Sequence, residues 1–184
     1  ALSDCCVTSS NALKIIDHYL ANGEKILYCP DRNLAKYAMK LRNVTFDCWD
    51  GDCCIHDNLN RQMVVNMKAI HPDALVVVHP EARLEVLEEA DYVGSTAGII
   101  DFVKKSPNKS FIVGTEEGIL HKLKKDNPEK EFFLLDEGLR CYDMKLTTLK
   151  DVYEVLENET NEVNVEESVR TNAYKALDTM LKLS

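Results

Sequence analysis

Residues 72–81 read PDALVVVHPE, and the apolar run at 74–78 decides the fold class. Three consecutive valines between two prolines are typical of a short, buried strand. Buried strands of this kind belong to parallel sheets, which helices cover on both faces. We therefore expect helices on either side of this strand in the sequence.

The sequence on both sides of this strand alternates between helical and extended patterns. Before residue 130, helical patterns lie at 11–22, 58–70, 81–90, 96–105 and 117–126, and a further one begins at Asp31 or Asn33. The other strand-like runs lie at 25–29, 44–48, 91–94, 110–114 and 131–135. Such alternation predicts βαβ units with right-handed crossovers and an α/β fold with a parallel sheet. Strands nearly vanish after residues 136–147, where two helices, 146–158 and 166–183, flank an extended segment, 161–165.

The composition excludes several classes of protein. The chain has 184 residues, of which 45% are hydrophobic and 29% charged, so it is globular rather than disordered. A net charge of −9 argues against nucleic-acid binding, and no apolar run is long enough to span a membrane. Seven cysteines, with two adjacent pairs and no predicted signal peptide, indicate a reducing cytoplasm rather than a disulfide framework.

Unusual polar residues follow five of the predicted strands. They are CPDRN, WDGDCCIH, HPE, GST and GTEEG, and each one precedes a predicted helix. Ligands bind at the carboxyl edge of a parallel sheet, because loops and helix N-termini converge there. The sequence therefore predicts a ligand site along this edge.

Two loops of small polar residues precede helices. TSSNA (Thr8–Ala12) and GST (Gly94–Thr96) suit a phosphate or carboxylate at the positive end of a helix. Ser and Asn are also preferred helix N-caps, which is the simpler interpretation. Two such loops together favour a small anionic ligand.

HPE has two interpretations, and GTEEG resembles a turn that leads into a helix. His79 and Glu81 suit substrate binding or proton transfer, or else Pro80 stiffens a turn that a capping glutamate follows. In GTEEG, Glu116 or Glu117 would be an acid in the first helical turn.

The segment DCWDGDCCIHD (47–57) concentrates cysteine, histidine and aspartate. It lacks a second CxxC pair, so a four-cysteine zinc module is not supported. Cysteines that the fold brings together from distant positions, such as Cys141, would suit an iron–sulfur cluster or have no common role. Cys6, Cys29 and Cys48 are expected to be buried, inert thiols.

In order, the motifs VTSSNA, CPDRNLAKY, CWDGDCCIHD, PDALVVVHPE, ADYVGSTAGI, FIVGTEEGILHKLKK and CYDMKLTTL resemble the quinolinate synthase family of NAD biosynthesis. The resemblance implies repeated three-layer αβα domains around a 4Fe–4S cluster that three cysteines bind. It also implies a transferase that condenses iminoaspartate with dihydroxyacetone phosphate to quinolinate, phosphate and water. One iron would stay open as a Lewis acid.

The resemblance assigns roles to individual residues. Cys53 and Cys141 match cluster ligands, and Glu81 matches the acid/base carboxylate with His79 beside it. The substrate-binding positions would be Ser9, Asn11, His56, His79, Glu81, Ser95 and Thr96. The aspartates around Cys53 would shape a tight loop, and the family does not require Cys54.

The chain matches only the C-terminal two-thirds of the family pattern. We therefore expect residues 1–56 to be a partial α/β domain, 57–140 a second one, and 141–184 a helical segment that packs on an absent N-terminal domain. The implied partners are the two substrates and, by direct contact or only through solution, L-aspartate oxidase, with neither nucleic acid nor membrane. Two alternatives stay open: a truncated, inactive fragment of this enzyme, or a non-enzymatic α/β module that binds a small anion or a metal.

Overall fold

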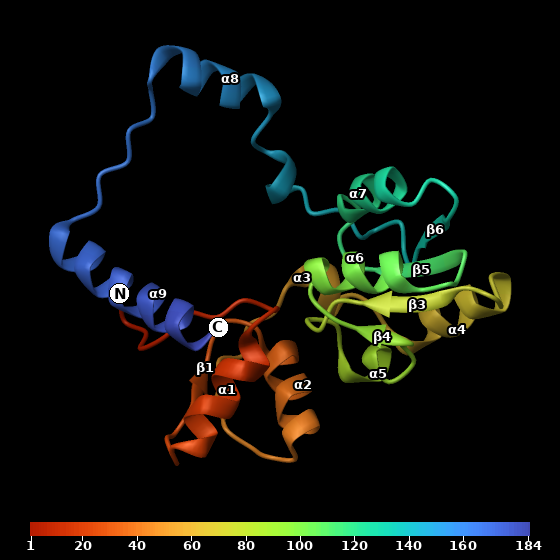
Figure 1. Ribbon diagram of the computed structural model, residues 1–184, viewed down its shortest axis with the longest axis horizontal. Helices are drawn as coiled ribbons and strands as arrows, with labels where there is room; N and C mark the ends of the chain where they lie inside the picture. The colour runs from red at the N-terminus through yellow and green to blue at the C-terminus, as the bar shows by residue number, and fades with distance from the viewer. The chain divides into compact units, whose positions relative to one another are not determined.

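Two parallel sheets form the framework of the chain, which the computed structural model describes over residues 1–184 (Figure 1). The first sheet pairs β1 (Leu27–Tyr28) with β2 (Asp47–Cys48). The second has the order β4-β3-β5-β6 and contains β3 (Leu75–Val78), β4 (Tyr92–Val93), β5 (Ser110–Gly114) and β6 (Glu131–Leu134). The predicted α/β class with short parallel sheets is confirmed.

The chain divides into two compact units. One unit contains Thr8–Arg140 and therefore both sheets, and the other joins Ala1–Val7 to Cys141–Ser184. The three-part division expected from the sequence stays a prediction.

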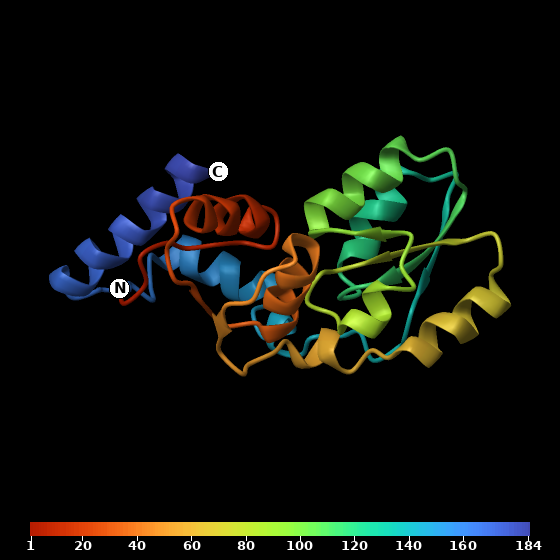
Figure 2. The same ribbon diagram turned by 90° about the horizontal axis from the view of Figure 1, so that it is seen from below.

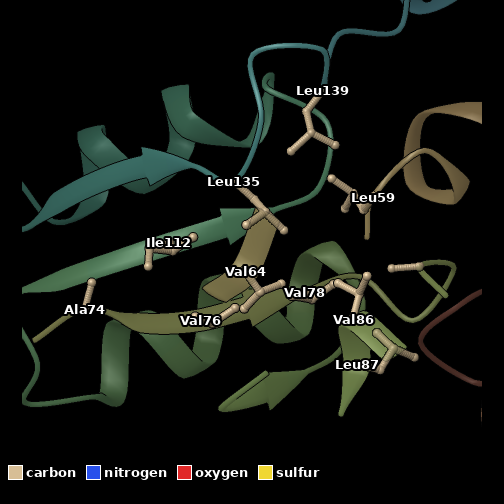
Figure 3. Close-up of a cluster of buried hydrophobic side chains, with 11 residues drawn as sticks. Leu59, Val64, Ala74, Val76, Val78, Val86, Leu87, Ile112, Leu135 and Leu139 are labelled. Carbon is tan, nitrogen blue, oxygen red and sulfur yellow. The ribbon is translucent and has the colours of Figure 1, made fainter. Parts of the chain in front are cut away.

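The larger sheet is buried on both faces because successive strand residues point in opposite directions. Val76 and Val78 of β3 pack with Val64, Val86 and other residues in one apolar cluster (Figure 3). Val77, between them, belongs to a second cluster on the opposite face. The valine run is continuous because a strand covered on both faces needs apolar residues at every position.

Helices lie on both faces of this sheet and give the three predicted layers (Figure 2). Val64 of α4 (Arg61–Ile70) and two residues of α5 (Leu84–Leu87) belong to the first cluster. Helices α6 (Thr96–Lys105) and α7 (Ile119–Asp126) supply the second.

The strand order creates a switch point between β3 and β5. The chain passes from β3 to β4 on one side, and then returns to β5 on the other side of β3. Loops diverge at such a point and leave room for a ligand beyond the carboxyl ends of the strands.

The first two helices agree with the sequence patterns. Helix α1 spans Ala12–Ala21, and Gly23 ends it with a φ of 71° that disfavours other residues. Helix α2 spans Arg32–Arg42, and the Asp31 side chain caps it by accepting from the backbone N–H of Leu34.

Several predicted boundaries are wrong for local reasons. The helix expected at 81–90 is only the single turn Leu84–Leu87, because a turn over 79–82 comes first and Arg83 has an extended backbone. The helix expected from residue 58 begins at Arg61, where the Asn60 side chain caps it. The loop expected around Cys53 includes a one-turn helix, α3 (Cys54–Asp57).

The acids of GTEEG also differ from expectation. Helix α7 has no acidic residue in its first turn, because its N-cap is Gly118. Glu116 instead accepts from the Gly118 backbone N–H at 2.7 Å. Its carboxylate therefore shapes the loop before the helix.

The regular structure in the unit formed by Ala1–Val7 and Cys141–Ser184 is helical. It contains a 3-10 turn (Asp143–Lys145), α8 (Leu149–Asn158) and α9 (Glu167–Leu183). Thr148 and Asp151 form a capping box at the start of α8, and the Cys6 backbone N–H donates to Ala176 of α9. No helix of the structure combines the length and apolar character needed to cross a membrane.

Candidate active site

The carboxyl ends of β3 and β5 bring the first site residues together. Val78 and Gly114 are register partners at the ends of these strands, and the His79 backbone N–H donates to the Gly114 carbonyl at 3.1 Å. His79 and Thr115 are the next residues along the two strands, and both are buried. They lie at the switch point of the sheet.

Helix α3 positions Cys53 and His56. Cys53 is its N-cap, and the Asp57 backbone N–H donates to the Cys53 carbonyl at 2.8 Å to close the turn. Residues three apart lie on the same side of a helical turn, so the spacing C-x-x-H brings the thiol and the imidazole together. Cys53 is half-buried and His56 is buried.

His56 connects α3 to both strand ends. Its Nδ1 lies 3.0 Å from Glu81 Oε2, and its Nε2 lies 3.0 Å from Thr115 Oγ1. The His56 ring also stacks on His79, with centroids 4.6 Å apart. Polar or ionisable groups of Cys53, His56 and Glu81 therefore lie within 4.8 Å of one another.

Strong coupling sets the charges of this cluster. Burial alone would lower the pKa of His56, but hydrogen bonds with Cys53 and Glu81 outweigh it and raise that pKa to about 9. The same hydrogen bond from His56 lowers the pKa of the Cys53 thiol. Burial would raise the pKa of Glu81, but His56 and His79 lower it, so its carboxyl is ionised.

The pKa of His79 is shifted in the opposite direction to that of His56, on which its ring stacks. Burial, followed by the positive charge of His56, lowers the pKa of His79 to about 4. The two rings therefore differ in charge at neutral pH, with His56 protonated and His79 neutral. A charged donor and a neutral imidazole then flank the Glu81 carboxylate.

Asp31 and Asp57 hold the α3 segment in place. Asp31 is buried, and while one of its oxygens caps α2, the other accepts from the Cys53 backbone N–H at 3.0 Å. The Asp57 carboxylate accepts from Asn33 of α2 at 2.9 Å and from Arg83 Nη2 at 2.8 Å. Hydrogen bonds at both ends of α3 therefore hold the segment that carries Cys53 and His56.

The two loops of small polar residues lie at helix N-termini, as expected. Ser95 is buried and caps α6 by accepting from Gly98 N–H at 3.1 Å, whereas Thr96 is exposed in the first turn. Ser9 and Asn11 are half-buried before α1. The Asn11 side chain does not cap α1 but accepts from the Thr8 backbone N–H at 2.7 Å.

Cys141 belongs to the other unit and is half-buried. All seven cysteines of the chain are thiols rather than disulfides, and none is buried, so the burial expected for Cys6, Cys29 and Cys48 is wrong. The structure thus brings Cys53, His56 and Glu81 together, with His79 stacked on His56, while Ser9, Asn11, Ser95 and Thr96 lie on separate loops of the same unit.

Sequence reasoning missed three contributors to this cluster: Thr115, Asp31 and Asp57. Thr115 lies inside GTEEG, in which only the glutamates were considered. Its position directly after β5 could have predicted that it lies at the carboxyl edge of the sheet. The capping position of Asp31 was also visible, but its second contact, with Cys53, joins residues 22 positions apart.

Three residues of this cluster offer donor atoms suited to a metal ion. Cys53, His56 and Glu81 each offer one ligand atom, and these atoms lie within 4.8 Å of one another. Thiolate sulfur and imidazole nitrogen suit iron or zinc rather than magnesium or calcium.

Comparison with known proteins identifies the family. The family model "Quinolinate synthetase A protein" matches residues 1–182. The quinolinate synthases of Geotalea uraniireducens (strain Rf4) and Alkaliphilus metalliredigens (strain QYMF) are 46% and 44% identical to the chain over 183 and 184 residues. The alignments cover 100% of the chain but only 60% of each relative's length. The chain therefore belongs to the quinolinate synthetase A protein family.

Proposed function

We propose that the chain carries part of the active site of a quinolinate synthase acting in NAD biosynthesis. The reaction would condense iminoaspartate with dihydroxyacetone phosphate and release phosphate and water, with quinolinate as the product. The observation that carries the proposal is the cluster at the switch point, where Cys53, His56 and Glu81 offer ligand atoms within 4.8 Å of one another. Membership of the family supports the assignment.

We assign Cys53 and Cys141 as ligands of a 4Fe–4S cluster. The donor chemistry fits, because both residues are half-buried thiols and thiolates are the usual ligands of such clusters. The Cys53 backbone N–H donates to Asp31 at 3.0 Å, which restrains the backbone that carries the thiol. With one iron open, the cluster would supply Lewis acidity toward oxygen or nitrogen atoms of the substrate.

Glu81 is the proposed general acid/base. The Glu81 side chain is 25% exposed, and its Oε2 lies 3.0 Å from His56 Nδ1. The carboxylate is therefore held by His56 and still accessible to a substrate. An ionised carboxylate can accept a proton from a substrate carbon or nitrogen and return it to a leaving hydroxyl. Protonated His56 holds Glu81 Oε2 in position and disfavours premature protonation of the carboxylate.

His79 and the small polar loops would bind substrate. A neutral imidazole can both donate and accept a hydrogen bond, which suits His79 for contact with a substrate carboxylate or hydroxyl. Ser9, Asn11, Ser95 and Thr96 lie at the N-termini of α1 and α6, where backbone N–H groups favour phosphate and carboxylate. L-aspartate oxidase would supply iminoaspartate, and we expect the protein to act in the cytoplasm.

The test uses the protein expressed at the length of its relatives and, in parallel, the 184-residue chain. Each is reconstituted anaerobically with iron and sulfide, and iron content, visible absorption and quinolinate formation are measured. We expect about four irons per longer protein, and loss of the iron chromophore in Cys53→Ser and in Cys141→Ser. Cys54→Ser is the matched control, because the neighbouring thiol is exposed and should not be needed.

Glu81→Gln separates catalysis from cluster binding. It should keep the iron chromophore and lose turnover, since the amide cannot accept the proton. A chromophore that survives Cys53→Ser and Cys141→Ser would overturn the cluster assignment and favour a non-enzymatic module. Turnover by the longer protein alone would identify the 184-residue chain as an inactive fragment.

A further inference from the structure

Cys53, His56 and Glu81 have the arrangement of a mononuclear metal site. Zinc bound to sulfur, nitrogen and oxygen at roughly 2.0–2.3 Å places its ligand atoms about 3.5 Å apart in a tetrahedron. His56 Nδ1 and Glu81 Oε2 are already 3.0 Å apart, and all three ligand atoms lie within 4.8 Å of one another. The separations of the three donors are therefore close to those that a single ion requires.

The surroundings orient these donors. Metal-bound histidines normally donate their second ring N–H to a neighbouring oxygen, which fixes the ring. Here Thr115 Oγ1, on a residue that is 1% exposed, lies 3.0 Å from His56 Nε2, and the other ring nitrogen, Nδ1, faces Glu81. Asp31 fixes the backbone of Cys53 in the same way, at 3.0 Å.

The donor set selects the ion. One thiolate, one imidazole and one carboxylate suit zinc or cobalt, and exclude magnesium and calcium, which prefer oxygen ligands. On binding, a divalent ion replaces the His56 Nδ1 proton and the Cys53 thiol proton, both of which are released, and its charge balances the resulting thiolate and the Glu81 carboxylate. Three protein ligands leave a fourth position for water.

We infer that the chain without an iron–sulfur cluster binds a single Zn²⁺ or Co²⁺ ion through Cys53 Sγ, His56 Nδ1 and the Glu81 carboxylate. This site does not use Cys141, and it does not depend on the proposed enzymatic activity. If the proposed cluster also forms, the two occupants exclude each other because both require the Cys53 sulfur. Zinc would then block cluster assembly at this position.

Cobalt titration of the 184-residue chain tests this inference. The reduced chain is stripped with a chelator under anaerobic conditions, and CoCl₂ is added while absorption is recorded. We expect a near-ultraviolet thiolate-to-cobalt band, and the intense visible bands of four-coordinate Co²⁺, saturating with a single ion per chain. Added Zn²⁺ should remove both.

Variants assign the ligands. Cys53→Ser should abolish the near-ultraviolet band, whereas Cys54→Ser, which changes the adjacent exposed thiol, should titrate like the parent. Glu81→Gln should weaken Co²⁺ binding, and Thr115→Val, which changes only the outer contact of His56, should weaken it by about 10–100-fold. Far-ultraviolet circular dichroism establishes that each variant is folded, and Thr115→Val tests the site even if Cys53→Ser is unfolded.

Cys141→Ser distinguishes this inference from the proposed cluster. The cobalt bands should persist in Cys141→Ser, even though the iron chromophore of a reconstituted cluster should be lost. Unchanged cobalt bands in folded Cys53→Ser, or their loss in folded Cys141→Ser, would overturn the mononuclear site. The spectrum of six-coordinate Co²⁺ without a thiolate band would also overturn it.

Discussion

The Asp57→Asn substitution tests whether the carboxylate next to His56 braces the site. The side chain of Asp57 is 13% exposed, accepts hydrogen bonds from Arg83 Nη2 at 2.8 Å and from Asn33 at 2.9 Å, and forms an ion pair with Arg32 Nη2 at 3.1 Å. The hydrogen bond from Arg83 is the main reason that the pKa of Asp57 falls from 3.8 to about 2. Asparagine keeps the shape of the side chain but removes its charge.

The lowered pKa of Asp57 sets the loss of unfolding free energy that we expect in Asp57→Asn. A change from 3.8 to about 2 in the folded state corresponds to about 2.4 kcal/mol of stability at neutral pH. Arg83 is 47% exposed, so solvent screening reduces this value. We expect Asp57→Asn to lower the free energy of unfolding by about 1.5–2 kcal/mol at pH 7.

The loss should depend on pH with a defined sign. A carboxyl whose folded pKa is depressed stabilises the protein above its unfolded pKa of 3.8, and this stabilisation disappears as the pH falls through about 2. The difference between parent and variant should therefore be complete at pH 7 and shrink to about half near pH 3.

Urea unfolding followed by circular dichroism at both pH values measures this difference. Asp101→Asn is the matched control, because the Asp101–Lys105 pair is exposed and should contribute no more than about 0.5 kcal/mol. A loss in Asp57→Asn as small as in the control at pH 7, or a loss that does not change with pH, would refute the reasoning.

Two further substitutions test the packing around the site. Leu139→Ala removes a side chain that is 1% exposed in the cluster of Figure 3, and should lower the free energy of unfolding by about 2–5 kcal/mol in urea titrations; a loss below about 1 kcal/mol would contradict its place in the core. Gly51→Ala would place a Cβ atom 2.7 Å from the Pro30 carbonyl oxygen, so the loop leading to Cys53 must shift. We expect Gly51→Ala to weaken Co²⁺ binding with little change in far-ultraviolet circular dichroism, whereas parent-like cobalt titration would show that the loop tolerates the side chain.

The sequence by itself determined the elements and the edge at which the site lies. The β-branched runs at 75–78 and 110–114 and the apolar spacing of 96–105 depend on contacts within a few residues, so their patterns are visible locally. The polar residues that follow each strand share the carboxyl edge of a parallel sheet wherever that strand lies. The sequence placed His79, Glu81, Cys53 and His56 at one edge of a single sheet. In the structure Cys53 and His56 follow β2 of the two-stranded sheet, whereas His79 and Glu81 follow β3 of the four-stranded sheet, so their proximity joins the edges of two sheets.

Only the tertiary structure decided which of these residues meet. His56 contacts Glu81 across 25 positions and Thr115 across 59, and no periodicity in the sequence records such contacts. The order β4-β3-β5-β6 places the end of β5 beside that of β3, which brings Thr115 to the same place as His79. Strand order depends on how whole faces pack and not on local propensity, so the sheet had to be assembled before Thr115 could be recognised as part of the site.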